Sequence, residues 1–260
     1  MCGRFSLFAE RDEVVAQFHV DDAVDGGVAD GPVGGRAGGL AGGQHPRYNV
    51  APSQPVLAVV SSADGSRRRL GTFRWGLVPH WAKDPSIGNR MINARVETAG
   101  SAPSFCAAFE KRRCLVPASG YYEWKAPEGS KGGSEGGSQR GSRPRKTPYY
   151  FHRRDGLLLA MGGLWEVWHG PDGEVLRTCT ILTTDANGTN APIHDRMPLI
   201  VPRRRWDEWL APSPLADEAR ADVLAPVPDD LLLVERVSDR VNDPRNDSPD
   251  LIEPAEVGGG

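Results

Sequence analysis

The second residue, Cys2, occupies the position with the most distinctive chemistry in this sequence. Methionine aminopeptidase generally removes an initiator methionine that precedes a small residue, so the mature chain is expected to begin with Cys2. Its free amine and thiol, with reference pKa values of about 8 and about 8.5, would both be partly nucleophilic near neutral pH. Such a pair condenses with an aldehyde to an imine and then closes a five-membered thiazolidine. An ordinary, frayed terminal residue is the alternative that position alone leaves open.

Two further residues have the types needed for proton transfer. Glu123 lies between aromatic residues in the segment YYEW. Burial among them would raise its pKa and make it a usable acid and base. His194 lies in the segment IHDRMP, in an expected loop after Thr183–Asp185. Each has a simpler explanation, because a glutamate can pair with an arginine and a histidine can be a hydrogen-bonded core residue.

Polar residues and tryptophans also interrupt apolar segments at two other places. If the segment INARVET is extended, Asn93, Arg95 and Glu97 lie on one face of the strand. The segment FRWGLVPHW carries Trp75 and Trp81 around a glycine and a proline. Such tryptophans either stack on nucleic-acid bases or fill a hydrophobic core, and the sequence leaves both roles open.

These residues must be positioned by a fold that is rich in strands. Short apolar runs bounded by Gly, Pro or Asp predict strands at Val56–Val60, Arg69–Leu77, Arg113–Pro117, Tyr149–His152, Leu157–Ala160, Thr178–Thr183 and Leu231–Val237. Helices are expected at Glu10–Phe18, Pro103–Glu110, Arg204–Leu210 and Leu215–Leu224. Many strands that do not alternate with helices predict an α+β domain around an antiparallel, barrel-like sheet with a few flanking helices.

The chain of 260 residues fits one domain that is interrupted by two glycine-rich insertions. Asp25–Gly43 and Ala126–Lys146 hold nine and six of the 31 glycines. Both have too little apolar surface to fold, so residues 1–256 are expected to form a single catalytic domain with flexible insertions at 25–43 and 126–146. Apolar residues make up 39% and charged residues 25% of the chain, as in a soluble globular protein.

Neither a metal nor a cofactor is indicated. The four cysteines form no CxxC pair, the six histidines lack ligand spacing, and no phosphate-binding glycine motif follows a strand. Cys106, Cys114 and Cys179 lie in apolar segments and are expected to pack as small hydrophobic side chains. Without a disulfide framework or a secretory signal, the expected compartment is a reducing cytoplasm.

Charge is unevenly distributed along the chain. Residues 207–260 hold 14 acidic and 4 basic residues, whereas residues 1–206 hold 20 acidic and 27 basic residues, a net charge of +7. A local excess of basic residues is compatible with a polyanionic partner, although solvated surface arginines explain it equally well. The excess of arginine over lysine, 26 to 5, is typical of a GC-rich bacterial genome.

Six segments occur in order across nearly the whole chain, namely CGRF, RYNVAP, WGLVPHW, INARVET, RRCLVPASGYYEW and HDRMP. In this combination the sequence strongly resembles the SOS response-associated peptidase family, whose members process abasic sites in single-stranded DNA. The resemblance extends from Cys2 to about Val241 and implies a single α+β domain built on a barrel-like sheet. It also implies self-cleavage of Met1, followed by a thiazolidine crosslink between Cys2 and the ring-opened aldehyde of the abasic deoxyribose, which protects the lesion.

The resemblance implies catalytic roles for four positions. Cys2 would supply the amine and the thiol, and Asn93 would hold the N-terminal residue and the sugar. Glu123 would move protons during Met1 removal, ring closure and crosslink reversal. His194 would assist sugar ring opening and imine formation. Proton transfer of this kind needs no metal or cofactor.

The resemblance and the residue types also nominate DNA contacts. Because an abasic site has no base to read, recognition must use phosphates and shape. Arginines would clamp phosphates, a glycine would allow close backbone approach, a tryptophan would stack on a neighbouring base, and the RYNVAP segment would line the channel. The arginines are Arg4, Arg95 and Arg196, the glycine is Gly3 and the tryptophan is Trp75. The residues of the RYNVAP segment are Asn49 and Pro52.

Two other functions stay open at this point. Cys2, His194 and Glu123 have the residue types of a thiol peptidase that acts on other proteins. The basic residues 1–206 and the tryptophans would suit a non-catalytic module that binds single-stranded DNA. The leading expectation is a bacterial, cytoplasmic, nucleoid-associated monomer. Its expected partners are abasic single-stranded DNA and replication-fork proteins, with no membrane partner.

Overall fold

The computed structural model describes residues 2–23, 45–127 and 145–255. The insertion Asp25–Gly43 lies outside the described residues, as does most of Ala126–Lys146. Within the described part, no helix has the length and apolar character needed to cross a membrane.

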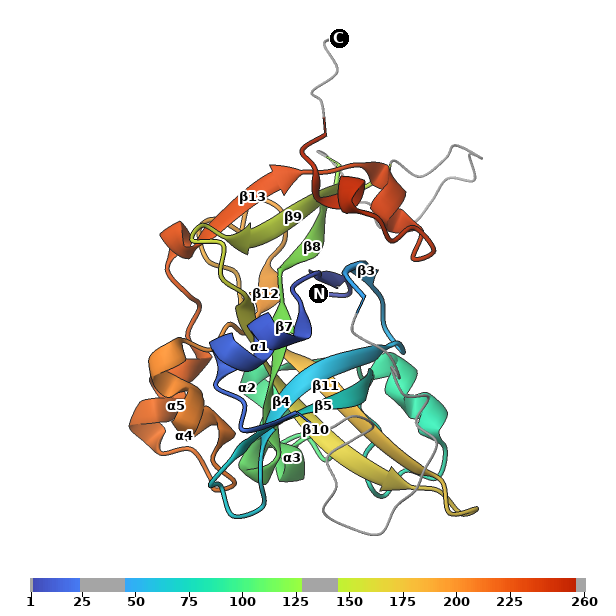
Figure 1. The fold of residues 1–260 in the computed structure, drawn as a ribbon, viewed down its shortest axis with the longest axis vertical. Coiled ribbons are helices and arrows are strands. Elements are labelled where there is room, and N and C mark those ends of the chain that lie inside the picture. Colours follow the sequence, from blue (N-terminus) through green and yellow to red (C-terminus); the bar gives the residue numbers. More distant parts are fainter. Residues whose placement is uncertain (1, 24–44, 128–144, 256–260) are drawn as a thin grey trace, which may run out of the picture.

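Five strands close a barrel in the lower half of Figure 1, namely β4 (Pro55–Ser61), β5 (Arg68–Trp75), β7 (Arg113–Ala118), β10 (Leu159–His169) and β11 (Val175–Asp185). Strand β4 pairs with β5 and β7, β7 with β10, β10 with β11, and β11 with β5. Four of these pairs are antiparallel, whereas the closing pair β5–β11 is parallel. The predicted α+β fold around a barrel-like sheet is therefore confirmed, and the parallel closing pair departs from the expected antiparallel pattern.

The burial of the barrel strands follows from their sequences. Val56–Val60 in β4 are all buried, as expected for a continuous apolar run with both faces covered. In the second half of β5, Phe73 and Trp75 are buried and Thr72 and Arg74 are half-buried, because successive side chains of a strand point to opposite faces.

A second sheet extends from the barrel toward the top of Figure 1, in the order β13 (Leu232–Arg236), β9 (Thr147–Arg153), β8 (Gly120–Lys125), β1 (Phe5–Leu7) and β3 (Arg47–Val50). A single residue, Ser119, separates the barrel strand β7 from β8. Strand β1 lies between β8 and β3, so the N-terminal segment is paired on both sides within this sheet.

Short elements complete the fold. The short strands are β2 (Asp22–Ala23), β6 (Asn93–Arg95) and β12 (Arg196–Pro198). The helices are α1 (Arg11–Phe18), α2 (Val96–Ala99), α3 (Cys106–Lys111), α4 (Trp206–Leu210) and α5 (Asp217–Leu224), and 3-10 turns occur at Pro85–Arg90, Arg203–Arg205, Asp229–Leu231, Asp239–Asn242 and Pro249–Ile252. Helix α1 begins with a capping box in which Glu10 and Glu13 each accept a backbone N–H, and it buries Val14 and Phe18.

A buried arginine ties two of the helices to the barrel. Arg113, 1% exposed at the start of β7, donates to five carbonyl oxygens at 2.6–2.8 Å. These carbonyls lie in the last turns of α3 and α4 or in the segment just after α4, where helix C-termini leave acceptors unsatisfied and attract positive charge. Burial lowers the pKa of Arg113 to about 10.

Most predicted elements are confirmed, and two differences are informative. Strand β10 continues to His169, because it pairs with β11 from Gly163 to His169. Gly162 and Gly163 do not end the strand but mark close packing, where a Cβ atom would meet Leu199 at 2.8 Å or the Thr180 carbonyl at 2.6 Å. The expectation that Glu97 shares a strand face with Asn93 and Arg95 is wrong, because β6 ends at Arg95 and α2 begins at the next residue.

Candidate active site

Cys2 lies in the core with no exposed surface. The side-chain amide of Asn93 donates to its carbonyl oxygen at 2.8 Å. Asn93 is the first residue of β6, and the pairing of β6 with the parallel strand β11 fixes its position. The Oδ1 atom of Asn93 is buried and has no hydrogen-bond partner among the described residues, so an acceptor is left for a group that arrives at Cys2.

Glu123 is 2% exposed on β8. Burial raises its pKa to about 7, because the ionised carboxylate is poorly solvated there. The pKa of the Cys2 thiol is also raised, first by burial and then by the charge of Glu123. The carboxyl and the thiol are therefore within electrostatic range of each other, and the thiol stays protonated at neutral pH.

His194 lies in the loop between β11 and β12. Its Nδ1 atom accepts the backbone N–H of Arg196 at 3.0 Å and lies 3.0 Å from the carboxylate of the exposed Asp195. The backbone hydrogen bond requires a lone pair on Nδ1 and so favours a neutral ring with its proton on Nε2. Burial lowers the pKa of His194, which also favours the neutral form near pH 7.

The ammonium group of Lys146 affects the pKa values of both Glu123 and His194. Burial is the largest influence on the pKa of each, and the charge of Lys146 has a smaller lowering effect on both. The pKa values of Glu123, on β8, and of His194, in the loop before β12, are therefore both lowered by the same ammonium group. The four positions nominated as catalytic thus come from four separate parts of the chain.

The two tryptophans of the WGLVPHW segment have opposite surroundings. Trp75 is fully buried, packs against Phe5 at a ring distance of 5.2 Å, and donates its indole N–H to the Ile92 carbonyl at 2.8 Å. The prediction that Trp75 stacks on a DNA base is therefore wrong, because the ring supports β1 and the segment before Asn93. Trp81 is 52% exposed and has the accessible ring that stacking requires.

A contact between two glycines fixes the loop that carries Trp81. Gly76 has a φ of +127°, and a Cβ atom on it would lie 2.4 Å from the Gly88 carbonyl oxygen. A Cβ atom on Gly88 would lie 2.6 Å from the Gly76 carbonyl oxygen. Only glycine allows both the conformation and the close approach here.

The arginines nominated as DNA contacts differ in whether they already form ion pairs within the protein. Arg196 forms a bidentate pair with Glu97 at 2.7 and 2.9 Å and a further ion pair with Asp185 at 2.6 Å. A phosphate would have to compete with these two carboxylates. Arg95 is exposed beside Asn93 and forms no ion pair with the residues that the structure describes. It is the nominated arginine best placed to meet a phosphate.

Arg4 and Asn49 join the N-terminal segment to the C-terminal one. Arg4 donates to the Asn49 side-chain oxygen and to the Val241 carbonyl, both at 2.7 Å. Asn49 is fully buried, and its amide donates to the carbonyls of Val241, Asp243 and Asn246. Direct contact between Asn49 and DNA is therefore a wrong expectation. The flanking candidates Gly3 and Pro52 are half-buried and keep accessible surface.

The remaining cysteines do not join the site. Cys114 and Cys179 are fully buried in the barrel, and burial raises both thiol pKa values, to about 12 for Cys179. Cys106 is half-buried at the start of α3. Within the described ranges, no group of three or more His, Cys, Asp or Glu side chains is arranged to hold a metal ion.

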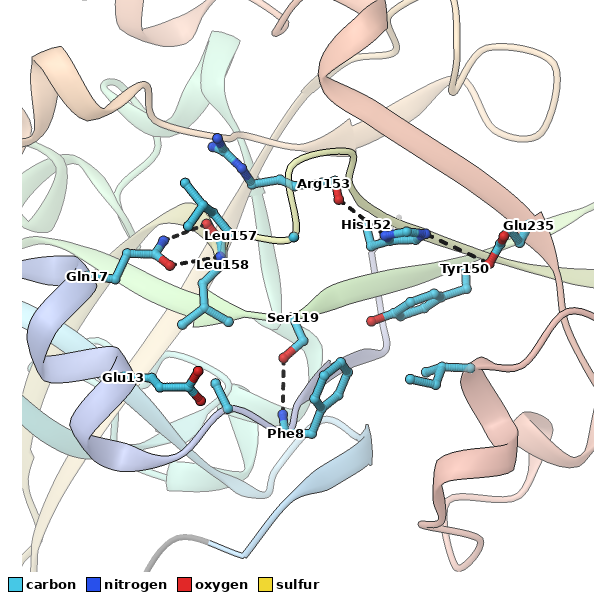
Figure 2. A pocket seen from close by; sticks show the side chains of 13 residues that line it. Phe8, Glu13, Gln17, Ser119, Tyr150, His152, Arg153, Leu157, Leu158 and Glu235 are labelled. Atoms are coloured by element: carbon cyan, nitrogen blue, oxygen red, sulfur yellow. Dashed lines mark hydrogen bonds and ion pairs between the residues drawn. The ribbon is translucent and has the colours of Figure 1, made fainter.

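A cavity of about 490 Å³ lies on the other side of the second sheet, and Figure 2 shows its lining. Gln17 exchanges two hydrogen bonds with the backbone of Leu158, and His152 lies 3.8 Å from Glu235. None of the nominated catalytic or DNA-binding residues lines this cavity. Most of its polar side chains already have partners in the protein, so the cavity does not itself indicate a ligand.

Comparison with known proteins identifies the family to which the chain belongs. The family model for the SOS response associated peptidase (SRAP) matches residues 1–244, so the chain belongs to this family. The abasic site processing protein YoqW of Bacillus subtilis is 40% identical over 253 residues, which are 97% of this chain and 99% of YoqW. The abasic site processing protein HMCES of Gallus gallus is 34% identical over 82% of this chain and 67% of its own length.

A solved structure shares the whole fold. The crystal structure of a protein from Bacteroides thetaiotaomicron covers 98% of this chain and all of its own, with a TM-score of 0.75 and 26% identity. The barrel and the second sheet therefore belong to a fold that is also found in experimentally determined structures.

Proposed function

We propose that this protein captures abasic sites in single-stranded DNA by forming a covalent bond to Cys2 after removal of Met1. The observation that carries the proposal is the buried assembly of Cys2, Asn93 and Glu123. Cys2 is held through its carbonyl, and an acid/base with a pKa of about 7 lies within electrostatic range of its thiol. The names of the relatives YoqW and HMCES, both abasic site processing proteins, point to the substrate.

The proposed reaction has three steps. Hydrolysis of the Met1–Cys2 peptide bond consumes one water molecule and frees the Cys2 amine. The amine then adds to the aldehyde carbon of the ring-opened deoxyribose, and the carbinolamine loses one water molecule to give an imine. Finally, the thiol sulfur adds to the imine carbon, and the thiol proton ends on the nitrogen. The product is a thiazolidine that links the protein to DNA.

Two residues move the protons of this sequence. Glu123 can both accept and return a proton, because its pKa of about 7 matches the working pH. It receives the proton that the amine loses on addition and protonates the hydroxyl that leaves as water. His194 is neutral because its pKa is lowered, so it can accept the anomeric hydroxyl proton when the sugar ring opens.

The state of the thiol separates this proposal from a thiol peptidase. A peptidase needs a pre-formed thiolate, yet burial and the Glu123 charge raise the pKa of the Cys2 thiol. Attack by the amine needs no thiolate, and the thiol acts only when the imine is already in place. A simple DNA-binding module, in turn, has no use for a buried carboxyl whose pKa is raised toward 7.

The DNA strand is proposed to run past Arg95 and Trp81. Arg95 is exposed next to Asn93 and can pair with a phosphate, while the exposed Trp81 ring can stack on a base beside the lesion. Stacking of this kind contributes about 1–3 kcal/mol per base. We therefore expect Trp81→Ala to weaken binding to single-stranded DNA by about 5- to 150-fold.

A denaturing gel with a labelled oligonucleotide that carries one abasic site tests the proposal. Wild type should give a slow band on abasic DNA and none on intact DNA, and Cys2→Ala should give no band. Cys2→Ser keeps the amine but has no thiol, so its adduct should appear only when borohydride reduces the imine. Intact mass must first show that Met1 is absent from each protein.

The outcomes separate the alternatives. A wild-type-like band from Cys2→Ala would exclude Cys2 chemistry. Equal binding of intact and abasic strands with no covalent band would indicate a binding module. Turnover of added peptides by the Met1-free protein would indicate a general thiol peptidase.

A further inference from the structure

A hydrogen-bond chain connects the strand of Glu123 to the loop of His194. Tyr121 lies two residues before Glu123 on β8, so both side chains face the same side of the sheet. The Tyr121 hydroxyl donates to the Oδ1 atom of Asn190 at 2.9 Å. Both residues are fully buried, and neither belongs to the acid/base chemistry described above.

Asn190 organises the loop that carries His194. Its side-chain amide donates to the carbonyl of His194 at 2.9 Å and to that of Arg196 at 3.0 Å. Its own carbonyl accepts the backbone N–H of His194 at 3.0 Å. Asn190 thus binds both the backbone N–H and the carbonyl of His194. It also binds the carbonyl of Arg196, whose backbone N–H donates to the imidazole of His194.

Tyr121 also lies close to the reacting groups. Its pKa is raised well above the ordinary value, first by burial and then by the charges of Cys2 and Glu123. The ring is stacked on Phe151 at a centroid distance of 4.9 Å, nearly parallel to it, so its position is fixed by packing. Because the Tyr121 hydroxyl stays protonated near neutral pH and its ring is fixed by packing, it remains a hydrogen-bond donor to Asn190.

We propose that Tyr121 and Asn190 form a positioning pair that sets the imidazole of His194 at a fixed place relative to Glu123 and Cys2. The loop between β11 and β12 has no helix or strand of its own to define the place of His194. The Tyr121–Asn190 hydrogen bond connects this loop to the strand that carries Glu123. Proton transfer falls steeply when donor and acceptor are misplaced, so this bond controls the rate.

The inference rests on the proposed crosslinking reaction, and Tyr121→Phe tests it. This variant keeps the ring and its stacking and removes the hydrogen bond to Asn190. The matched control is Tyr150→Phe. Tyr150 lies on the neighbouring strand β9, is 3% exposed, and forms a comparable buried hydrogen bond to Ser6 at 2.8 Å, on the opposite face of the sheet.

The first readout is the single-turnover rate of adduct formation on an abasic oligonucleotide at saturating DNA. Tyr121→Phe should slow it about 10-fold and Tyr150→Phe less than 2-fold. In a His194→Ala background, Tyr121→Phe should slow the reaction less than 2-fold further, because the residue that it positions is already gone. An equal 10-fold loss in that background would show that Tyr121 acts independently of His194 and would overturn the inference.

The second readout does not need the reaction. The titration of His194, followed by its imidazole NMR signals, should shift in Tyr121→Phe and in Asn190→Ala but not in Tyr150→Phe. Unchanged His194 signals in Tyr121→Phe, with the fold intact by circular dichroism, would overturn the positioning pair. Absence of an adduct in wild type would instead refute the proposed function, so the two failures are distinguishable.

Discussion

The two faces of the β8–β9 region are built from similar residues and have different chemistry. Tyr121 and Glu123 point to one face, and Tyr122 and Tyr150 to the other. On the second face, Tyr122 donates to the Tyr48 carbonyl at 2.7 Å and Tyr150 pairs with Ser6. Each of these hydroxyls has a partner on a strand of the same sheet, and several polar groups that line the cavity beside them are paired with one another (Figure 2).

The first face carries the buried carboxyl of Glu123. It is also connected to the loop that carries His194. Glu123 has its pKa raised to about 7 by burial, and Tyr121 reaches across to the His194 loop. Both faces have buried tyrosines, and the cavity lies on the second face, so neither feature identifies the face proposed to be functional. The feature that distinguishes the first face is a buried carboxyl close to a nucleophile.

Replacing the carboxyl on each face should give the largest contrast. Glu123→Gln removes the proposed proton shuttle and should slow adduct formation at least 100-fold, the range of general acid–base catalysis. Glu235→Gln, on the cavity side, should leave the rate within 2-fold. Both rates are measured on protein whose Met1 is shown to be absent. Equal rates for Glu123→Gln and wild type would remove Glu123 from the mechanism.

The pH dependence of the rate should identify the titrating group. Because burial raises the pKa of Glu123 to about 7, the carboxylate that accepts the amine proton is depleted below that pH. Protonation of the Cys2 amine lowers the single-turnover rate below about pH 8, and we expect loss of the Glu123 carboxylate to add a further fall of about tenfold per pH unit below pH 7. The inflection near pH 7 should vanish in Glu123→Gln and persist in Glu235→Gln. If that inflection is retained in Glu123→Gln, it belongs to another group.

The same carboxyl should make the protein less stable at high pH. A carboxyl whose folded pKa is raised from 4.5 to about 7 favours the folded state below pH 4.5, and this contribution is lost as the pH rises through 7. Glu123→Gln should therefore be more stable than wild type at pH 8, by on the order of 3 kcal/mol. Urea unfolding at pH 5 and pH 8 measures the difference, which should be much smaller at pH 5. A variant that is less stable at pH 8 would contradict this prediction.

Changes in the cavity should have the smallest effect. Leu157 is 47% exposed at the rim, and His152 faces Glu235 across the lining. We expect Leu157→Ser and His152→Ala each to change the rate of adduct formation and DNA binding by less than 2-fold. A loss of tenfold or more in either would show that the two faces are coupled and that the cavity contributes to the reaction.

The sequence predicted the barrel better than the surroundings of the site. Runs such as Val56–Val60 predict strands because continuous apolar segments need cover on both faces. Strand β8 is harder to predict, since its residues follow directly on β7 with only Ser119 between them. The resemblance nominated Cys2 and Asn93, and the structure brings them together through a hydrogen bond.

The errors have a common physical cause. Trp75 and Trp81 lie in one short segment, and only the tertiary packing decides which ring is buried. Asn49 resembles a polar binding residue until its partners, three carbonyls nearly 200 residues away, are known. Tyr121 has a detectable signal in its i, i+2 spacing from Glu123, whereas Asn190, one of several small polar residues in a loop, has none.

The insertion of β1 between β3 and β8 also dictates an order of events during synthesis. The partner strand β8 begins at Gly120, so the first segment has no completed sheet to enter until well over a hundred residues have left the ribosome. Domains generally fold after their contacting segments have been made, and pairings that are distant in sequence form late. Cys2 therefore remains in solvent through the first half of translation and is enclosed afterwards. The enclosure of Cys2 is therefore a late event in folding, because it depends on a strand that begins at Gly120.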